Sequence, residues 1–139
     1  MSDSIQSGRA PKPLGAYPHA RRAGNFLFLS GIGPRPAGGG PVAGIVFDDA
    51  GNVASYDIEA QVHAVFANVR AVLEDAGAGW SDLIDVTVFL TDIARDFDTY
   101  NRLYATYFDG NGPTRTTVEV SRLPGPIAIE LKCVAALRD

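Results

Sequence analysis

Apolar residues recur at helical spacing in two stretches of the chain. The first covers residues 56–76, with Ser55 as the expected N-cap and Gly77 suited to the turn after the last helical residue. The second covers residues 96–109 and carries an aromatic stripe. Both patterns predict helices that bury one face. The first stripe comprises Ile58, Val62, Val65, Phe66, Val69, Val72 and Leu73, and the second Phe97, Tyr100, Tyr104, Tyr107 and Phe108.

Shorter apolar runs and alternating segments predict strands before, between and after these helices. The expected strands cover residues 19–22, 26–30, 43–47, 84–91, 113–120 and 127–136. This order, β-β(-β)-α-β-α-β-β, indicates an α+β fold in which two helices cover one face of a mixed or mainly antiparallel sheet. The opposite face also carries apolar residues and would be bare in a single chain. An exposed apolar surface of that size predicts a homo-oligomer.

The last two strand-like segments flank the breaker Leu123-Pro124-Gly125-Pro126 and are expected to form a hairpin-like unit. Alternation places Arg115 and Thr117 on one face of the first segment. In the second segment it places Glu130 opposite the apolar face that includes Cys133. A charge among apolar neighbours is costly to bury unless it is paired or used. Arg115 and Glu130 are therefore the candidate working residues, and the alternative is an ordinary cross-strand ion pair.

Other chemistries find little support in the residues. His19 and His63 lie in unrelated segments, and the chain has neither a nucleophile elbow nor a metal-ligand spacing. Cys133 is expected to be a buried small hydrophobe rather than a nucleophile. The proline- and glycine-rich loop at residues 33–42 lacks the glycine spacing of a phosphate-binding loop. We expect no metal site.

Composition and charge bear on the number of domains, the class of partner and the cellular compartment. The 139 residues suit one domain, and we expect a flexible N-terminal arm at residues 1–13 followed by a single domain at 14–139. A net charge of −4 argues against a nucleic-acid surface. No apolar run is long enough to cross a membrane. The N-terminus lacks the apolar core of a signal peptide, and the single cysteine suits a reducing compartment, so a cytoplasmic protein is expected.

Several motifs, in the same order along the chain, resemble the reactive intermediate deaminase family (RidA, also called YjgF). They are Gly15-Ala16-Tyr17, Phe28-Leu29-Ser30-Gly31, residues 86–92, Tyr100-Asn101, and above all residues 113–120 with Arg122-Leu123-Pro124 and Ile129-Glu130. The resemblance extends from about Pro13 to Ala136. It implies a chorismate-mutase-like fold and a homotrimer whose three sheets form a central barrel. It also implies sites in the clefts between subunits and no metal or organic cofactor.

The resemblance also assigns roles to residues. In the deaminating members, the residue that matches Arg115 holds the substrate carboxylate. The residue that matches Glu130 handles the water and protons that hydrolyse an enamine or imine. Thr117 stands where the general members often have cysteine, so this pocket would be polar but would lack a thiol. The positions that match pocket-lining residues are Tyr17, Ser30, Gly31 and Asn101.

Finer features resemble the 2-aminomuconate deaminases of aromatic-compound degradation, namely residues 17–31, 34–36, 43–44, 112–118 and 129–132. The expected reaction converts 2-aminomuconate to 4-oxalocrotonate and ammonia. This substrate has two carboxylates, so a second cation would help; His19, Arg22 and Arg35 are candidates, and Arg22 is expected to be merely solvated. The alternatives are a general deaminase for 2-iminobutanoate and 2-iminopropanoate, or a trimer that binds 2-oxo acids without turnover. The ribonuclease activity attached to parts of the family is disfavoured by the acidic charge.

Overall fold

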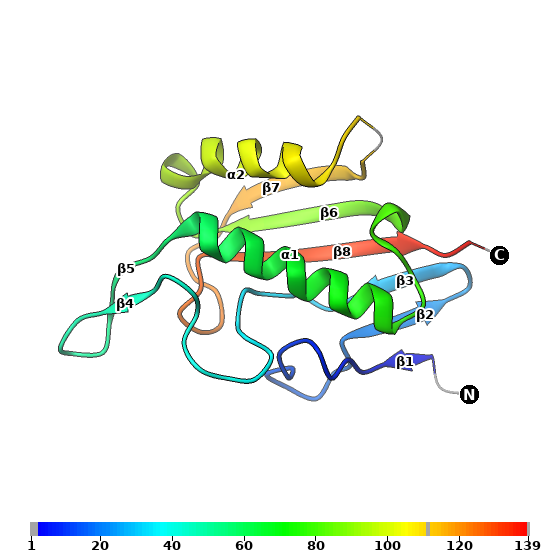
Figure 1. Ribbon diagram of the computed structural model, residues 1–139, viewed down its shortest axis with the longest axis horizontal. Helices are drawn as coiled ribbons and strands as arrows, with labels where there is room; N and C mark the ends of the chain where they lie inside the picture. The colour runs from blue at the N-terminus through cyan, green and yellow to red at the C-terminus, as the bar shows by residue number, and fades with distance from the viewer. Residues whose placement is uncertain (1–2, 111, 139) are drawn as a thin grey trace.

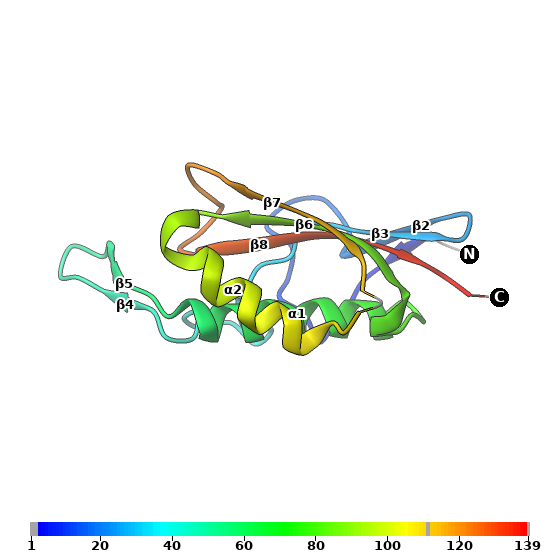
Figure 2. The ribbon, with the colours of Figure 1, turned by 90° about the horizontal axis from the view of Figure 1, so that it is seen from above.

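The computed structural model describes residues 3–110 and 112–138, so residues 1–2 of the expected arm, Asn111 and Asp139 lie outside the described residues. One large sheet carries both long helices on the same face (Figures 1 and 2). In chain order the elements are β1 (Ser4–Ile5), β2 (Ala20–Ala23), β3 (Phe26–Leu29), β4 (Val46–Phe47), β5 (Val53–Ser55), α1 (Ile58–Asp75), the 3₁₀ turn η1 (Trp80–Asp82), β6 (Leu83–Leu90), α2 (Ile93–Tyr107), β7 (Thr114–Glu119) and β8 (Ile129–Ala136).

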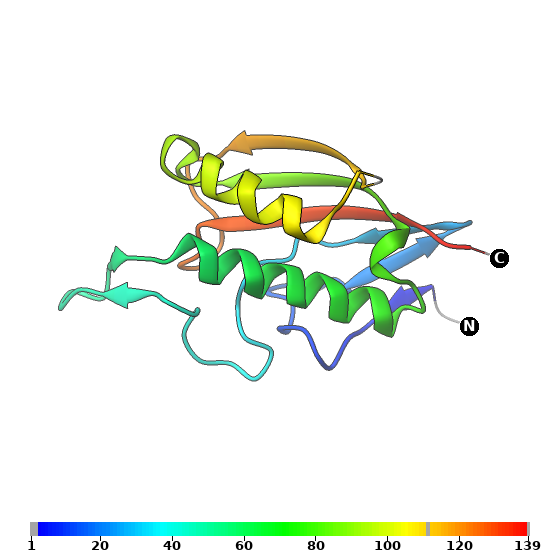
Figure 3. The same cartoon turned by 45° about the horizontal axis from the view of Figure 1, so that its top comes forward.

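The large sheet has six strands in the order β1-β2-β3-β8-β6-β7. Strands β6 and β7 are parallel because α2 carries the chain back between them, and the other neighbours are antiparallel. Strands β4 and β5 pair separately and project beyond the end of the sheet (Figures 1 and 3). The predicted α+β class with a mixed sheet is confirmed. No described helix is long and apolar enough to cross a membrane.

The prediction that the last two strands form a hairpin-like unit is wrong. Strands β7 and β8 are not neighbours, because β6 lies between them: Val86 pairs with Arg115 on one side and with Cys133 on the other. The chain leaves β7 at an edge of the sheet and passes the end of β6 before β8 begins. The breaker at residues 123–126 therefore makes a crossing rather than a tight turn.

The helices follow the predicted stripes but begin at other residues. Helix α1 begins at Ile58, and the carboxylate of Asp57, rather than Ser55, caps it by accepting a hydrogen bond from the Ala60 backbone N–H at 3.2 Å. Gly77 has a φ of 83°, as expected after a helix end. Helix α2 begins before the expected residue because Asp92 caps it. All seven residues of the first stripe are buried.

The segment expected to be a loose arm makes extensive contacts with the domain. Strand β1 pairs with β2, and the side chain of Ala10 is buried in the core. The guanidinium of Arg9 lies at the C-terminal end of α1, where Nη2 is 2.8 Å from Oδ1 of Asp75 and 3.2 Å from the main-chain oxygen of Ala71. These contacts fix where the following residues lie.

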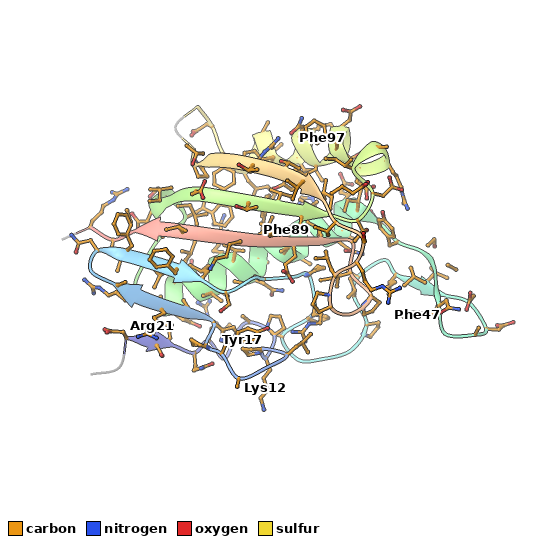
Figure 4. The ribbon with its side chains drawn as sticks, turned by 180° about the vertical axis from the view of Figure 1, so that it is seen from behind. Lys12, Tyr17, Arg21, Phe47, Phe89 and Phe97 are labelled. Carbon is orange, nitrogen blue, oxygen red and sulfur yellow. The ribbon has the colours of Figure 1, made fainter. Side chains whose placement is uncertain are left out.

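The face of the sheet opposite the helices is uncovered in the single chain, as predicted (Figures 2 and 4). Large apolar side chains stand on it, with Phe26 47%, Phe28 43% and Val118 37% exposed. Phe89 lies near the middle of this face (Figure 4). Assembly through this face stays a prediction.

Placing a charge on this face should break the assembly. We expect Phe28→Glu to keep the fold but to lower the solution mass to about one third of the wild-type value, because a carboxylate would be desolvated in the closed trimer. Multi-angle light scattering measures the mass and circular dichroism checks the fold. Val53→Glu is the matched control, since Val53 is 42% exposed but lies in the projecting β4–β5 pair. A wild-type chain that is monomeric would contradict the prediction.

Candidate functional site

Arg115 lies on β7 beneath helix α2 and is held by aromatic rings. Its Cζ atom is 4.7 Å from the ring centroid of Tyr104, 5.4 Å from that of Tyr100 and 5.9 Å from that of Phe97. Its Nη2 donates a hydrogen bond to Oδ1 of Asn101 at 2.6 Å. The aromatic stripe of α2, which the sequence indicated only as core, therefore also forms a cradle for a cation.

The guanidinium of Arg115 has no carboxylate partner within the described part of the chain. Arg115 is in register with Val86 and Cys133, which are buried on the helix side of the sheet. Glu130 is three residues before Cys133 on β8 and therefore points to the other face. The alternative of a cross-strand Arg115–Glu130 ion pair is wrong.

Three hydroxyl groups near Arg115 are buried without a hydrogen-bond partner among the described residues. They belong to Tyr100, Tyr104 and Thr117. Burial raises the pKa of both tyrosines above the ordinary value, so both remain protonated at neutral pH. An unsatisfied buried hydroxyl costs about 1–3 kcal/mol. Such groups are typical of places where a water or ligand completes the hydrogen bonding.

A second group of candidate residues meets in a hollow at the other side of the sheet. Its lining includes Tyr17, His19, Ser30, Gly31 and Arg35, with the arm residues Ala10, Pro11 and Pro13. Five predicted site residues from three segments are thus brought together. Figure 4 shows the separation of the two groups, because the labelled Tyr17 and Phe97 lie at opposite margins of the sheet.

Glu130 lies directly against Gly31 in this second group. A Cβ built on Gly31 would be only 2.7 Å from Oε2 of Glu130, and the φ of Gly31 is not positive. The absence of a Cβ at Gly31 thus serves close approach to the Glu130 side chain rather than a left-handed backbone, a choice that the sequence left open. Burial raises the pKa of Glu130 above that of an ordinary glutamate. A carboxyl group with a raised pKa is well placed to exchange protons.

His19 is buried and uses both ring nitrogens on the N-terminal arm. Its Nδ1 accepts the Ser7 backbone N–H at 2.9 Å, and its Nε2 donates to the carbonyl oxygen of Pro11 at 2.8 Å. It lines the hollow with its ring, but neither nitrogen is free for a substrate. Arg35 gives one N–H to the Lys12 carbonyl at 2.9 Å. Arg22 is exposed, and its Nε–H donates a hydrogen bond to the carbonyl oxygen of Gly24 in the adjacent turn.

No cluster of three or more His, Cys, Asp or Glu side chains suited to a metal occurs within residues 3–110 and 112–138. The groups that the two candidate clusters offer for chemistry are the guanidinium of Arg115, the partly buried carboxyl group of Glu130 and several hydroxyls. The first group comprises Arg115, Asn101 and Thr117, and the second comprises Glu130, Gly31, Ser30 and Tyr17. They lie on different faces and do not meet within one chain.

Comparison with known proteins gives the family. Residues 7–137 match the family described as Endoribonuclease L-PSP. The chain belongs to this family. A RutC family protein from Pyrococcus horikoshii is 40% identical over 97% of this chain and 98% of its own length. Reactive Intermediate Deaminase A from Arabidopsis thaliana is 35% identical over 96% of this chain and 65% of its own. The crystal structure of Escherichia coli TdcF with bound serine is 31% identical, covers 97% of this chain and 98% of its own, and has a TM-score of 0.79.

The contacts of His19 predict a role in holding the arm. His19→Leu should lower the free energy of unfolding by about 1–3 kcal/mol, because the Ser7 N–H and the Pro11 carbonyl lose their partners. Amides of residues 5–9 should exchange faster with solvent, as measured by hydrogen–deuterium exchange. His63→Leu is the matched control, since His63 is exposed and contacts Tyr107 instead. Unchanged exchange in the arm would refute this role.

Proposed function

We propose that the protein is a deaminase that hydrolyses an imine or enamine of a 2-amino acid to the 2-oxo acid and ammonia. The observation that carries the proposal is the unpaired guanidinium of Arg115, held by three rings and Asn101. A guanidinium offers two parallel N–H groups that match a carboxylate. Family membership supports the same reading, since one relative is named a reactive intermediate deaminase and another was solved with serine, itself an amino acid.

Arg115 would bind the carboxylate next to the carbon that bears nitrogen. The Asn101 side chain holds one end of the Arg115 guanidinium, and the aromatic rings fix its plane. The arginine side chain therefore loses little conformational freedom when the substrate binds. The hydroxyls of Tyr104 and Thr117 lack partners in the described part of the chain. They are available to hydrogen-bond a substrate oxygen or a water beside the guanidinium.

Glu130 would supply the proton transfers. An enamine first tautomerises to the imine. Glu130 takes a proton from water as the water oxygen bonds to the imine carbon, and the proton passes to nitrogen. Glu130 then transfers the hydroxyl proton of this adduct to the nitrogen as the carbon–nitrogen bond breaks, so that ammonia leaves and the carbonyl of the 2-oxo acid forms. Partial burial favours this role because it raises the pKa of the carboxyl group.

Arg115 and Glu130 would act together across two copies of the chain. Within one chain they point to opposite faces of the sheet. The exposed apolar face with Phe26 and Phe28 provides a surface through which copies could assemble. We therefore propose a homotrimer in which Arg115 of one subunit faces Gly31 and Glu130 of the next.

For the substrate we propose 2-aminomuconate, which would give 4-oxalocrotonate. Its second carboxylate needs a second cation. His19 has no free nitrogen, whereas Arg35 lines the hollow and uses one N–H on Lys12. Arg35 is thus the favoured partner. The short imines 2-iminobutanoate and 2-iminopropanoate remain the rival substrates, and binding of a 2-oxo acid without turnover is the rival function. A nuclease is disfavoured by the net charge of −4.

The primary test is ammonia release from freshly generated 2-aminomuconate, with 2-iminobutanoate in parallel. Arg115→Ala should lower kcat/KM about 100-fold or more, because the substrate carboxylate loses its charged partner. Glu130→Ala should lower kcat by a similar factor through lost proton transfer. Arg102→Ala is the control, since Arg102 is exposed on the same helix as Asn101 and contacts only Glu59. Full turnover by either site variant would refute the proposal.

Mixing the two inactive variants tests the site between subunits. In trimers reassembled from equal amounts, half of the chains carry each intact residue, so about one quarter of the sites should contain both. Activity should recover to about that level. Mixtures that stay inactive, with mixed trimers demonstrated by native mass spectrometry, would mean that the two residues do not share a site across subunits.

The pH profile should report Glu130. Because burial raises its pKa, the acid limb of kcat/KM should lie at higher pH than for an ordinary glutamate. Activity and stability should respond to pH in opposite directions. A pKa of Glu130 that is higher in the folded than in the unfolded chain stabilises the folded protein at acid pH, and this stabilisation is lost as the pH rises through the folded-state pKa. Glu130→Gln should therefore be inactive, yet at neutral pH at least as stable as wild type in thermal melts. An unshifted acid limb, or a less stable variant, would contradict this.

A further inference from the structure

A separate hollow is lined by residues near the start of α1 and the start of β8. Figure 3 shows that the β4–β5 pair projects from this end of the sheet. It contains about 530 Å³ of empty space, part of it open to solvent. None of the residues assigned to deamination lines it. The lining residues are Val53, Tyr56, Gln61, Thr91, Ser121, Arg122, Leu123, Gly125, Pro126, Ile127 and Ala128.

Gln61, one of the lining residues, carries an unused hydrogen-bond donor. Its side chain is fully buried, and its Oε1 accepts the Ala128 backbone N–H at 2.8 Å. That bond fixes the amide orientation, because the reversed amide would set two donors against each other. The Nε2 atom has no hydrogen-bond partner among the described residues. Leaving such a donor unpaired is unfavourable unless a ligand or water accepts from it.

Arg122 supplies a positive charge at the same hollow. Its side chain is exposed and forms neither an ion pair nor a hydrogen bond within the described residues. No acidic residue lines the hollow. The hydroxyl of the lining residue Tyr56 donates to Asp96 at 2.6 Å, and Asp96 lies 3.5 Å from Nε of Arg95. The lining therefore contains hydrogen-bond donors without partners, in Gln61 and Arg122, and no carboxylate that would compete with a ligand for them.

The remaining walls are largely apolar. Leu123 and Ile127 are buried in a small cluster with Val42, and Val53 contributes an exposed aliphatic side chain. A ligand that fits must combine a group that accepts from Gln61 and Arg122 with a short aliphatic body. A phosphate or sulfate would satisfy the charge but leave the apolar wall uncovered.

We propose that this hollow is a second ligand site, distinct from the one around Arg115, and that it binds a short aliphatic carboxylate. The carboxylate accepts from Nε2 of Gln61 and from the guanidinium of Arg122, and the aliphatic chain packs on Leu123 and Ile127. The site is independent of the proposed deamination, because it shares no residue with it.

Titration with butyrate, followed by ¹⁵N–¹H spectra of the full chain, tests the proposal. The signals of the Gln61 side-chain amide and of the Ser121 and Ala128 backbone amides should shift and saturate. Arg122→Ala should weaken binding about tenfold or more, because a hydrogen bond to a charged group is lost. Gln61→Glu keeps an acceptor for Ala128 but removes the donor, and it should abolish the shifts.

Two control variants test whether butyrate binds in this hollow. Arg115→Ala should leave the shifts unchanged, whereas their loss in that variant would place butyrate at the deamination site and overturn the proposal. Arg102→Ala, another exposed arginine, should also bind normally; equal weakening there would indicate unspecific attraction of an anion and overturn it too. Absence of saturable shifts in the wild type would likewise overturn it. Arg122 is exposed, so its variant is expected to fold, and its thermal melt verifies this.

Discussion

The candidate site depends on a half-buried guanidinium that has no acidic partner among the described residues. A carboxylate beside Arg115 would stabilise the charge but would also occupy the donors that a substrate needs. Three aromatic rings and the Asn101 amide stabilise the cation without neutralising it. Each ring face contributes about 0.5–2 kcal/mol to a cation, depending on how far the pair is desolvated. The aromatic stripe of α2 therefore serves both the core and the charge, which explains why Tyr100 is fully buried yet close to an arginine.

The position of β6 separates the two halves of the site. Because α2 returns the chain parallel to β6, β7 becomes an edge strand and β8 has to pair on the opposite side of β6. Arg115 then faces the helices, and Glu130 faces the uncovered side, where Gly31 allows the backbone to reach its carboxyl group. The cooperation of Arg115 and Glu130 that we propose would therefore require a second copy of the chain. The same uncovered face is apolar, so the requirement for assembly and the surface available for it coincide.

The sequence predicted what depends on local periodicity and missed what depends on distant pairing. The α1 stripe and the alternation of side chains within β7 and within β8 followed from periods of 3.6 and 2 residues. The supposed hairpin failed because no local pattern shows that β6 lies between β7 and β8. The cap of α1 was misplaced because Ser55 and Asp57 are both suited to that role, and the start of α2 was placed near Asp96 although Asp92 caps it. The arm contacts were missed because His19 bonds backbone groups, which carry no sequence signal. The pocket-lining residues were indicated by the family resemblance, not by periodicity.

The contacts of His19 and Arg35 bear directly on substrate choice. Since both nitrogens of His19 hold the arm, the hollow has one candidate cation for a second carboxylate, Arg35. A guanidinium has five N–H donors, and the Lys12 carbonyl takes one of them. A short monocarboxylic imine would leave the others to solvent, whereas a dicarboxylate could engage them. A charge-assisted hydrogen bond is worth about 1.5–3 kcal/mol, or about 10- to 150-fold in affinity. Discrimination between the two substrate classes would therefore depend mainly on whether Arg35 reaches the distal carboxylate.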